Sequence, residues 1–581
     1  MDLVQVVTCK GSTQMKRSLA WAAALMVGAC GGDGGGVASG DPFCQQVLPA
    51  VSAFMVQARA DNPVPSDERY GGTAVAGGAG ELAGGMNVAG QVDYSAVQHH
   101  QFVNLMTLLD YDADGTPRPY LAESWEISDD NTEITWHIRQ DVMWHDGEQT
   151  DAHDVAFTYE VVTDPVTAFG NSSYWDHYEQ GSDAIEIVDD FTIKMRLRPH
   201  ADFLDPWRSV AIMPEHLLGD VPHDEIGGHP YGSQCPVGNG PFVFDSHDIN
   251  DRWIFTANPV FPEALGGRPF LDRYIYRMIP EQTTLLTELL TDNLEIYIKV
   301  RPDQADQIID APSVDLLNFT FRNYVMVVWN SRRPQLADSR VRRAITMATN
   351  RPEIVQAIQQ GYGTVANSSV PPFHWAYDRD PDFGTAYDRA GASALLDEAG
   401  WQDRDGDGVR ENADGLPLEF SIKYNTGNRQ RQNIAEIMQA QLGQVGITAT
   451  PEVVDFPTLL GQINSPEREF DGAVMGWVVE YKLDDMNLFH SERIDQPFAW
   501  SGTNNAELDR LLDELSFVVD RDEAIQLWSE YQRALDREHP YTFFYYPDQL
   551  DGVSKRLKGV TADARGEWVS VREWYLDPAS R

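Results

Sequence analysis

Apolar residues along the chain follow two different spacings. In 132–139 (TEITWHIR) and 190–198 (DFTIKMRLR) they occupy every second position, which is typical of strands with one buried face. In 339–361 they follow a helical spacing instead, and Asn350, followed at once by Arg-Pro-Glu, predicts that a second helix begins there. Both kinds of element are therefore expected.

The second half of the chain alternates between these spacings in a regular order. Helices are predicted at 386–399 and 429–445, and strands at 417–424 and 447–454. A regular succession of helix and strand is the pattern of an α/β fold. A chain of 581 residues exceeds what one hydrophobic core can serve, so about two to four domains are expected.

The first thirty residues have the layout of an export signal. Lys16 and Arg17 precede a short apolar run, 19–27, which is too short to span a bilayer and is followed by small residues and Cys30. The ending VGAC resembles a bacterial lipobox, so Cys30 is the expected lipidation site and Met15 the expected translation start. The alternative is a plain secretory signal with an incidental cysteine. A glycine-rich tether then leads to a body expected outside the cytoplasm, anchored to the membrane.

Two further cysteines, Cys44 and Cys235, fall in this exported part. Thiols in an oxidising compartment can pair, and this pair would fix the segment after the tether to the body. The sequence supplies no geometry for the pair. The paired and the free states are therefore both open.

The chain is strongly acidic, with 89 Asp and Glu against 44 Lys and Arg and a formal net charge of −45. Such a surface repels phosphate backbones, which excludes nucleic acid as a partner. It suits a cationic ligand or a salty habitat, or is only a solvated surface. The chain contains no G-x-S-x-G, H-E-x-x-H or G-x-x-x-x-G-K-[ST] motif, so nothing in it requires an enzyme.

An acidic run has the spacing of a twelve-residue calcium loop. The ligands that this spacing predicts are Asp403, Asp405, Asp407, Val409 through its carbonyl, Glu411 and Asp414. The closing Asp replaces the usual Glu, and a strand is predicted to follow where a helix would complete an EF-hand. The similar run at 110–115 fails the test, because Pro and Leu fall at positions 7 and 12. The loop is either a structural calcium clip or a turn.

Five runs, in order, resemble the large bacterial solute-binding proteins of peptide and nickel ABC importers, which form extracellular solute-binding protein family 5. The runs are 108–160, 237–244 (VGNGPFVF), 330–355, 397–422 and 476–485 (GWVVEYKLDD). The likeness covers roughly 75–581, and the lipobox agrees with it.

The resemblance implies an α/β fold of the periplasmic binding protein-like class II (cluster C), with two lobes around a cleft, a hinge and an extra inserted domain. The boundaries that it implies are 1–30 for the signal peptide, 31–69 for the tether and N-terminal segment, 70–107 with 236–325 and 545–581 for lobe I, 108–235 for the extra domain and 326–544 for lobe II. A monomer of this kind needs no cofactor, captures a peptide-like solute in the cleft and delivers it to an ABC permease.

The resemblance also implies ligand-binding residues. Trp477 and Tyr481 offer flat apolar faces, and Glu480 stands where peptide-binding relatives hold the ligand's α-amino group with an Asp. Further candidates are Asp484, Asn87, Asp93, Tyr94 and Trp500. Each of these residues could instead have only a structural role and make no contact with a ligand.

Two alternatives to a peptide ligand stay open. The same fold could bind another solute, such as a sugar, an opine or a nickel chelate. The acidic loop alone would also suit a secreted, calcium-stabilised hydrolase.

Overall fold

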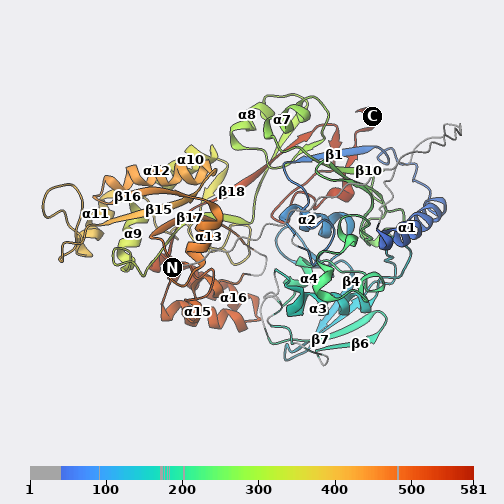
Figure 1. Ribbon diagram of the computed structural model, residues 1–581, viewed down its shortest axis with the longest axis horizontal. Helices are drawn as coiled ribbons and strands as arrows, with labels where there is room; N and C mark the ends of the chain where they lie inside the picture. Colours follow the sequence, from blue (N-terminus) through green and yellow to red (C-terminus); the bar gives the residue numbers. More distant parts are fainter. Residues whose placement is uncertain are drawn as a thin grey trace, which may run out of the picture. The chain divides into compact units, whose positions relative to one another are not determined.

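One sheet runs through most of the chain and joins its two halves (Figure 1). The computed structural model describes residues 41–90, 92–170, 175, 177–179, 181, 184–199, 203–479 and 483–580. In this part of the chain the sheet follows the order β16 (Thr448–Val454), β15 (Glu419–Asn425), β17 (Gly472–Val478), β13 (Asn323–Trp329), β18 (Tyr541–Ser554), β11 (Ile296–Tyr297), β1 (Thr73–Gly78), β10 (Arg273–Met278), β9 (Arg252–Ala257) and β8 (Phe242–Asp248). β12 (Val314–Thr320) and β14 (Gly363–Val365) pair with β18. The α/β fold predicted from the sequence is confirmed.

Strand β18 belongs to both halves of this sheet. Residues 541–547 pair antiparallel with β13 and β14, and residues 548–554 pair antiparallel with β12. β12 and β13 are consecutive strands, and only Phe321 and Arg322 separate them. The chain therefore crosses between the halves at two neighbouring places, 321–322 and the middle of β18.

Helices cover both faces of the half that contains the parallel strands β15, β16 and β17. One layer consists of α9 (Ser339–Ala348), α10 (Arg351–Gln359), α11 (Arg389–Glu398) and α12 (Arg429–Gly443). The other consists of α13 (Phe456–Asn464), α14 (Met486–Phe489), α15 (Ala506–Phe517) and α16 (Arg521–Glu538). Along β13, Met326 and Val328 face the second layer, and Val327 and Trp329 face the first, because side chains alternate along a strand. The helices and strands predicted for 386–454 are confirmed.

The other half of the sheet has cores of its own. It also contains α2 (Tyr94–His99), α7 (Gln282–Leu290), α8 (Ala305–Ile309) and the short pair β19 (Leu557–Lys558) and β20 (Tyr575–Leu576). Its larger core is rich in aromatic rings. Trp568 Nε1 donates to the hydroxyl of Tyr274 at 2.5 Å, and His99 Nε2 lies 3.0 Å from the same oxygen. The C-terminal segment is thereby fastened to β10 and α2.

A separate four-stranded antiparallel sheet is inserted between β1 and β8 of the large sheet. Its order is β4 (Ala122–Ile127), β5 (Glu133–Ile138), β7 (Thr192–Arg196) and β6 (Ile185–Asp189). The segment also contains the hairpin β2 (Leu109–Tyr111) and β3 (Pro117–Pro119), and the helices α3 (Ala152–Thr163), α4 (Asp205–Ser209), α5 (Glu215–Leu218) and α6 (His223–Ile226). The strands predicted at 132–139 and 190–198 are confirmed as β5 and β7. None of the helices in the described part of the chain is both long and apolar enough to cross a membrane.

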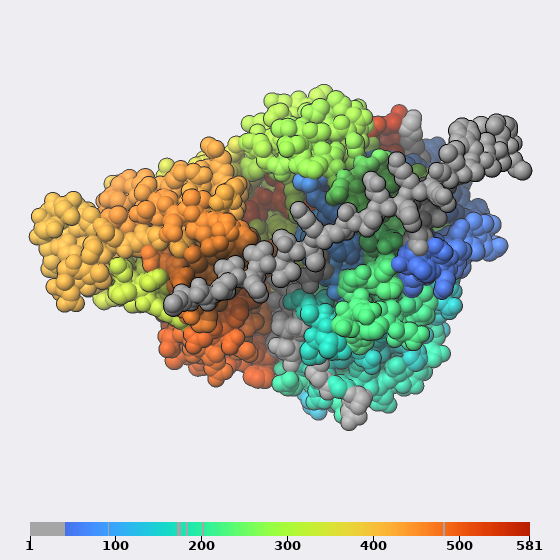
Figure 2. Space-filling model, viewed as in Figure 1, coloured from blue at the N-terminus to red at the C-terminus, as the bar shows by residue number. Residues whose placement is uncertain are grey.

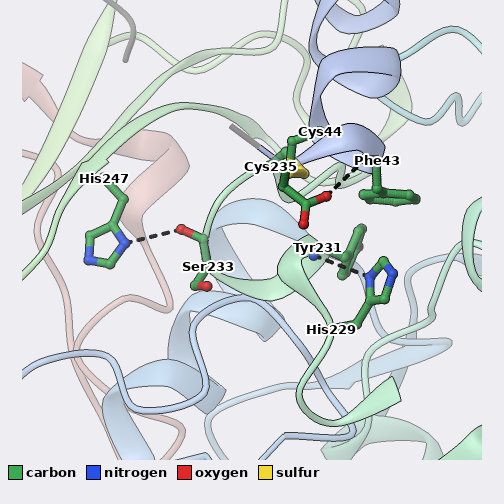
Figure 3. Close-up of a disulfide and its surroundings, with 8 residues drawn as sticks. Phe43, Cys44, His229, Tyr231, Ser233, Cys235 and His247 are labelled. Atoms are coloured by element: carbon green, nitrogen blue, oxygen red, sulfur yellow. Dashed lines mark hydrogen bonds between the residues drawn. A yellow bond between two sulfur atoms is a disulfide. The ribbon is translucent and has the colours of Figure 1, made fainter. Parts of the chain in front are cut away.

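Helix α1 (Pro42–Asp61) is held to the surface by a disulfide. Cys44 is bonded to Cys235, 191 residues further along the chain (Figure 3). Beside this bond, the ring of Phe43 lies edge-on to His229, with ring centroids 4.6 Å apart. In Figure 2 the blue residues of α1 lie against the green residues of the inserted segment. Of the two states that the sequence left open, the structure has the paired one.

We expect the double variant Cys44→Ser, Cys235→Ser to be less stable than the wild type. The disulfide spans 191 residues of chain, and cross-links of long loops contribute about 2–5 kcal/mol, in large part by restricting the unfolded chain. Thermal unfolding at one scan rate measures the loss. Dithiothreitol should lower the melting temperature of the wild type and leave that of the variant unchanged. Equal melting temperatures of the wild type and the variant, each with and without dithiothreitol, would contradict this stabilising role of the disulfide.

Candidate ligand-binding site

The carboxyl ends of the parallel strands β15, β16 and β17 lie at one edge of the sheet (Figure 1). At this edge, successive connections between the strands run in opposite directions across the sheet. From β15 the chain passes through α12 to β16 on one side, and from β16 through α13 to β17 on the other side of β15. α12 and α13 lie on opposite faces of the sheet. In open α/β sheets, ligands bind in the crevice outside the strand ends at such a switch point. The residues at this edge are therefore candidates for the site.

Aromatic side chains gather at this edge. The ring of Trp477, near the end of β17, lies 5.6 Å from the ring of Phe498 and 5.6 Å from that of Trp500. Phe498 and Phe456 are each 42% exposed. Trp500 is buried, and its Nε1 donates to Asn464 Oδ1 at 2.7 Å. Trp500 therefore supports the ring of Trp477, and its contact with a ligand stays a prediction.

The segment after β17 carries the other residues that the sequence singled out. Glu480 and Tyr481 lie outside the described residues. Just before them, Val479 N–H donates to the carbonyl of Arg322 at 2.7 Å, and Arg322 Nη1 donates to the carbonyl of Val479 at 3.3 Å. Asp484 is exposed, and its carboxylate accepts a hydrogen bond from a backbone N–H at 3.0 Å. The segment thus begins beside a crossing between the two halves.

The carboxylate of Asp485 holds the downstream end of this segment. It is buried and accepts hydrogen bonds from the hydroxyls of Ser369 and Tyr531, the second at 2.7 Å. Burial raises the pKa of Asp485 to about 6, although both hydrogen bonds act to lower it. A group that titrates close to neutral pH therefore lies next to the candidate site.

Two residues expected from the first pocket loop lie together in the other half. Asp93 caps α2 by accepting from Ala96 N–H at 2.8 Å, and burial raises the pKa of this carboxyl. The hydroxyl of Tyr94 donates to Glu567 Oε2 at 2.9 Å, and Lys299 Nζ lies 4.6 Å from the centre of the Tyr94 ring. Tyr94 is half-buried and Lys299 is exposed. Both side chains are therefore accessible to a solute.

The structure gives Asn87 a different place from the one expected. Its side chain is buried, Nδ2 donates to the carbonyl of Ile226 at 2.6 Å, and Oδ1 accepts from Ala89 N–H at 3.1 Å. Both ends of the amide are thereby used within the fold. Asn87 joins a turn to α6, and its place at the rim of a cleft stays a prediction.

The sequence reasoning did not select Arg431. This residue lies in the first turn of α12, and burial lowers the pKa of its guanidinium. Its Nη1 donates to Asn425 Oδ1 at 2.9 Å, and its guanidinium carbon lies 5.8 Å from the centre of the Phe456 ring. Its place directly after a predicted strand, at the start of a predicted helix, was the available signal, because strand ends of this kind carry ligand sites.

The acidic loop brings together only part of its predicted ligand set. Oxygens of Asp403, Asp405 and Glu411 lie within 4.8 Å of one another. The carboxylates of two other predicted ligands, Asp407 and Asp414, are not in this group. Asp403 accepts from two backbone N–H groups of the loop, at 2.7 and 3.2 Å, and Asp407 from one at 2.8 Å. The site with six ligands stays a prediction, of which the structure brings three carboxylates together.

Comparison with known proteins agrees with this architecture. Residues 116–493 match the model of the bacterial extracellular solute-binding proteins, family 5 (middle region). The oligopeptide-binding protein AppA of Bacillus subtilis is 30% identical over 461 residues, which cover 78% of this chain and 83% of AppA. Its structure in complex with a nonapeptide matches with a TM-score of 0.72 at 28% identity, over 88% of this chain and 99% of that one. NikZ of Campylobacter jejuni in complex with Ni(L-His) shares the fold, with a TM-score of 0.71 at 23% identity, over 88% of this chain and 100% of that one.

We expect Asp485→Asn to be at least as stable as the wild type above pH 6. The folded pKa of about 6 lies above the ordinary 3.8, so this residue's contribution to stability is complete below pH 3.8 and is lost as the pH rises through 6. Asn keeps an acceptor for both hydroxyls and cannot ionise. Melting temperatures across this pH range test the expectation, with the exposed Asp484→Asn as control. A variant that is less stable than the wild type at neutral pH contradicts it.

We expect removal of calcium with a chelator to leave the melting temperature unchanged. The exposed carboxylates of Asp403 and Asp407 already accept backbone N–H groups, so the 403–414 loop can close as a turn. Calorimetric titration with calcium provides the measurement, with Asp405→Ala as the matched variant. Binding heat in the wild type that Asp405→Ala abolishes would show that the loop is a calcium clip.

Proposed function

Because the chain belongs to the bacterial extracellular solute-binding proteins of family 5, we propose that its solute is peptide-like. The chain is the substrate-binding component of an ABC importer. AppA, the relative named above, is an oligopeptide-binding protein, and a single binding site of this class can accept many side chains when aromatic faces line it. The aromatic edge around Trp477 is the observation that carries the proposal.

We propose that the solute lies between the carboxyl ends of β15–β17 and the Tyr94–Lys299 face of the other half. Contacts made to both halves exist only when the cleft is closed, so the solute itself stabilises the closed state. The crossings at 321–322 and within β18 would act as the hinge. The resemblance assigns the ligand's amino group to Glu480, which lies outside the described residues and directly follows Val479 in the sequence.

The same likeness supports the lobe boundaries proposed from the sequence. Lobe I (70–107, 236–325 and 545–581) contains the two cores beneath β1 and β8–β12. Lobe II (326–544) contains most of the two cores on either side of β13 and β17, to which Tyr324, Tyr545 and Tyr546 also belong. The extra domain (108–235) contains most of the fifth. Each proposed unit therefore has a hydrophobic core with which to move as a body.

We further propose that the chain is exported, acts as a monomer and is anchored through lipid on Cys30, which lies outside the described residues. The disulfide between Cys44 and Cys235 suits an oxidising compartment outside the cytoplasm. The family consists of extracellular solute-binding proteins.

The proposal is tested with protein lacking residues 1–30, purified without denaturation. We expect denaturation to release bound peptides, which mass spectrometry then identifies. Trp477→Ala should weaken peptide binding about tenfold or more in calorimetry, because buried aromatic contacts dominate such interfaces. Trp125→Ala, which removes another half-buried indole in the extra domain, is the matched control and should bind normally.

Release of a sugar, an opine or a metal chelate in place of peptides would keep the transport role and overturn the peptide assignment. Hydrolysis of a substrate panel with no retained ligand would contradict both.

A further inference from the structure

The extra domain (108–235) proposed above is fastened to lobe I at several separate places. The side chain of His145 is buried, and its Nε2 lies 3.0 Å from the carbonyl oxygen of Gly240. At another place, Arg565 Nη1 donates to the carbonyl of Tyr111 at 2.7 Å. Buried hydrogen bonds of this kind are costly to break without replacement. They therefore hold the extra domain to lobe I.

Helix α1 crosses the junction between the same two parts. Near its start, the disulfide joins it to Cys235, the last residue of the extra domain. In its middle, the ring of Phe54 lies against the turn at Gly147, where a Cβ atom would be only 2.8 Å from the ring. Near its end, Arg59 Nη2 donates to Thr256 Oγ1 of β9 at 3.0 Å. We therefore expect the extra domain and lobe I to move as one body.

The extra domain also meets lobe II, around a cavity of about 660 Å³. The walls of this cavity come from the β2–β3 turn and the start of α4 on one side, and from residues 373–375 and the start of α16 on the other (Figure 1). A stretch of lobe I separates these two parts in the sequence, so the chain does not link them directly. Motion about the proposed hinge at 321–322 and β18 therefore alters this contact and leaves the fastening to lobe I in place.

Phe373 joins lobe II to the core of the extra domain. Its ring is half-buried and packs against the hydrophobic core of that domain. Trp375 covers the β2–β3 turn, since a Cβ atom at Gly115 would lie 3.9 Å from its Cδ1. The guanidinium carbon of Arg521, the first residue of α16, lies 4.1 Å from the centre of the Trp375 ring. Aromatic rings thus form much of the contact from the side of lobe II.

The two contacts of the extra domain differ in kind. The contact with lobe I is reinforced by a disulfide and by buried hydrogen bonds. The contact with lobe II surrounds a cavity, and a cavity forfeits part of the dispersion energy that close packing supplies. The second contact is therefore the one that can open and close at low cost.

We propose that the contact of Phe373 with the core of the extra domain is a latch that stabilises the closed cleft, whichever solute is bound. The inference rests on the proposed function, from which it takes the lobes and the hinge. A contact made only in the closed state raises the closed fraction of the ligand-free protein. The apparent affinity for every solute rises with that fraction. The latch would thus increase affinity from a place that need not touch the solute.

The latch is tested in protein lacking residues 1–30 from which bound solute has been removed by denaturation, dialysis and refolding. Spin labels on Glu186→Cys in the extra domain and Glu530→Cys in lobe II, both exposed positions, report the distance between these parts by pulsed electron paramagnetic resonance. We expect Phe373→Ala to reduce the population at the short distance about fivefold without any solute, because the closed state loses an apolar contact.

The matched control is Phe191→Ala. Phe191 is also half-buried and packs against the same core, but it belongs to the extra domain itself. Its removal costs that core a ring and leaves the contact with lobe II intact, so the distances should not change. Phe373→Leu, which keeps an apolar group at the contact, should recover most of the short-distance population. Unchanged distances in ligand-free Phe373→Ala, or an equal change in Phe191→Ala, would overturn the latch.

Affinity gives a second readout. Calorimetry with several unrelated pentapeptides that the wild type captures from a random pool should show the same loss for each in Phe373→Ala, about fivefold. A loss confined to some of these peptides would place Phe373 in the solute's site and overturn the latch. Capture of no peptide at all would refute the peptide assignment alone, because the ligand-free distances decide the latch without any solute.

Discussion

The pairing of β18 with strands of both halves is the constraint on which the rest of the structure depends. One end of β18 is bonded to β13 and β14, and the other to β12 and β11. The halves share this strand and the short connection 321–322, so each can keep its own core while the angle between them changes. Arg322 and Val479 tie the start of the expected ligand segment to that connection. A solute bound there would act directly on the hinge.

The distribution of charge explains how so acidic a protein can hold a polar solute. Two acids near the site are engaged within the fold: Asp485 is buried and hydrogen-bonded, and Asp93 caps a helix. Their charge is therefore not directed into the crevice. Arg431 places a positive charge at the strand ends, where its Nη1 donates to Asn425 Oδ1. We propose that the aromatic rings supply contact area for the solute.

Local pattern was enough to predict most of the fold. The alternation in 132–139 and the helical spacing of 429–445 depend on one face of a single element, and both elements formed as expected. The site was only partly predictable, because burial depends on distant segments. Trp477 and Trp500 look equivalent in the sequence, yet Asn464 fastens only Trp500. Asn87 meets Ile226 only because of long-range packing.

The central claim is that one solute contacts both halves of the protein. Hydrogen–deuterium exchange with and without the co-purified solute measures this most directly. The account predicts slower exchange both at the carboxyl ends of β15–β17 with the first turn of α12, and at the start of α2 in the other half. Protection confined to one half, or to the acidic loop at 403–414, would contradict it.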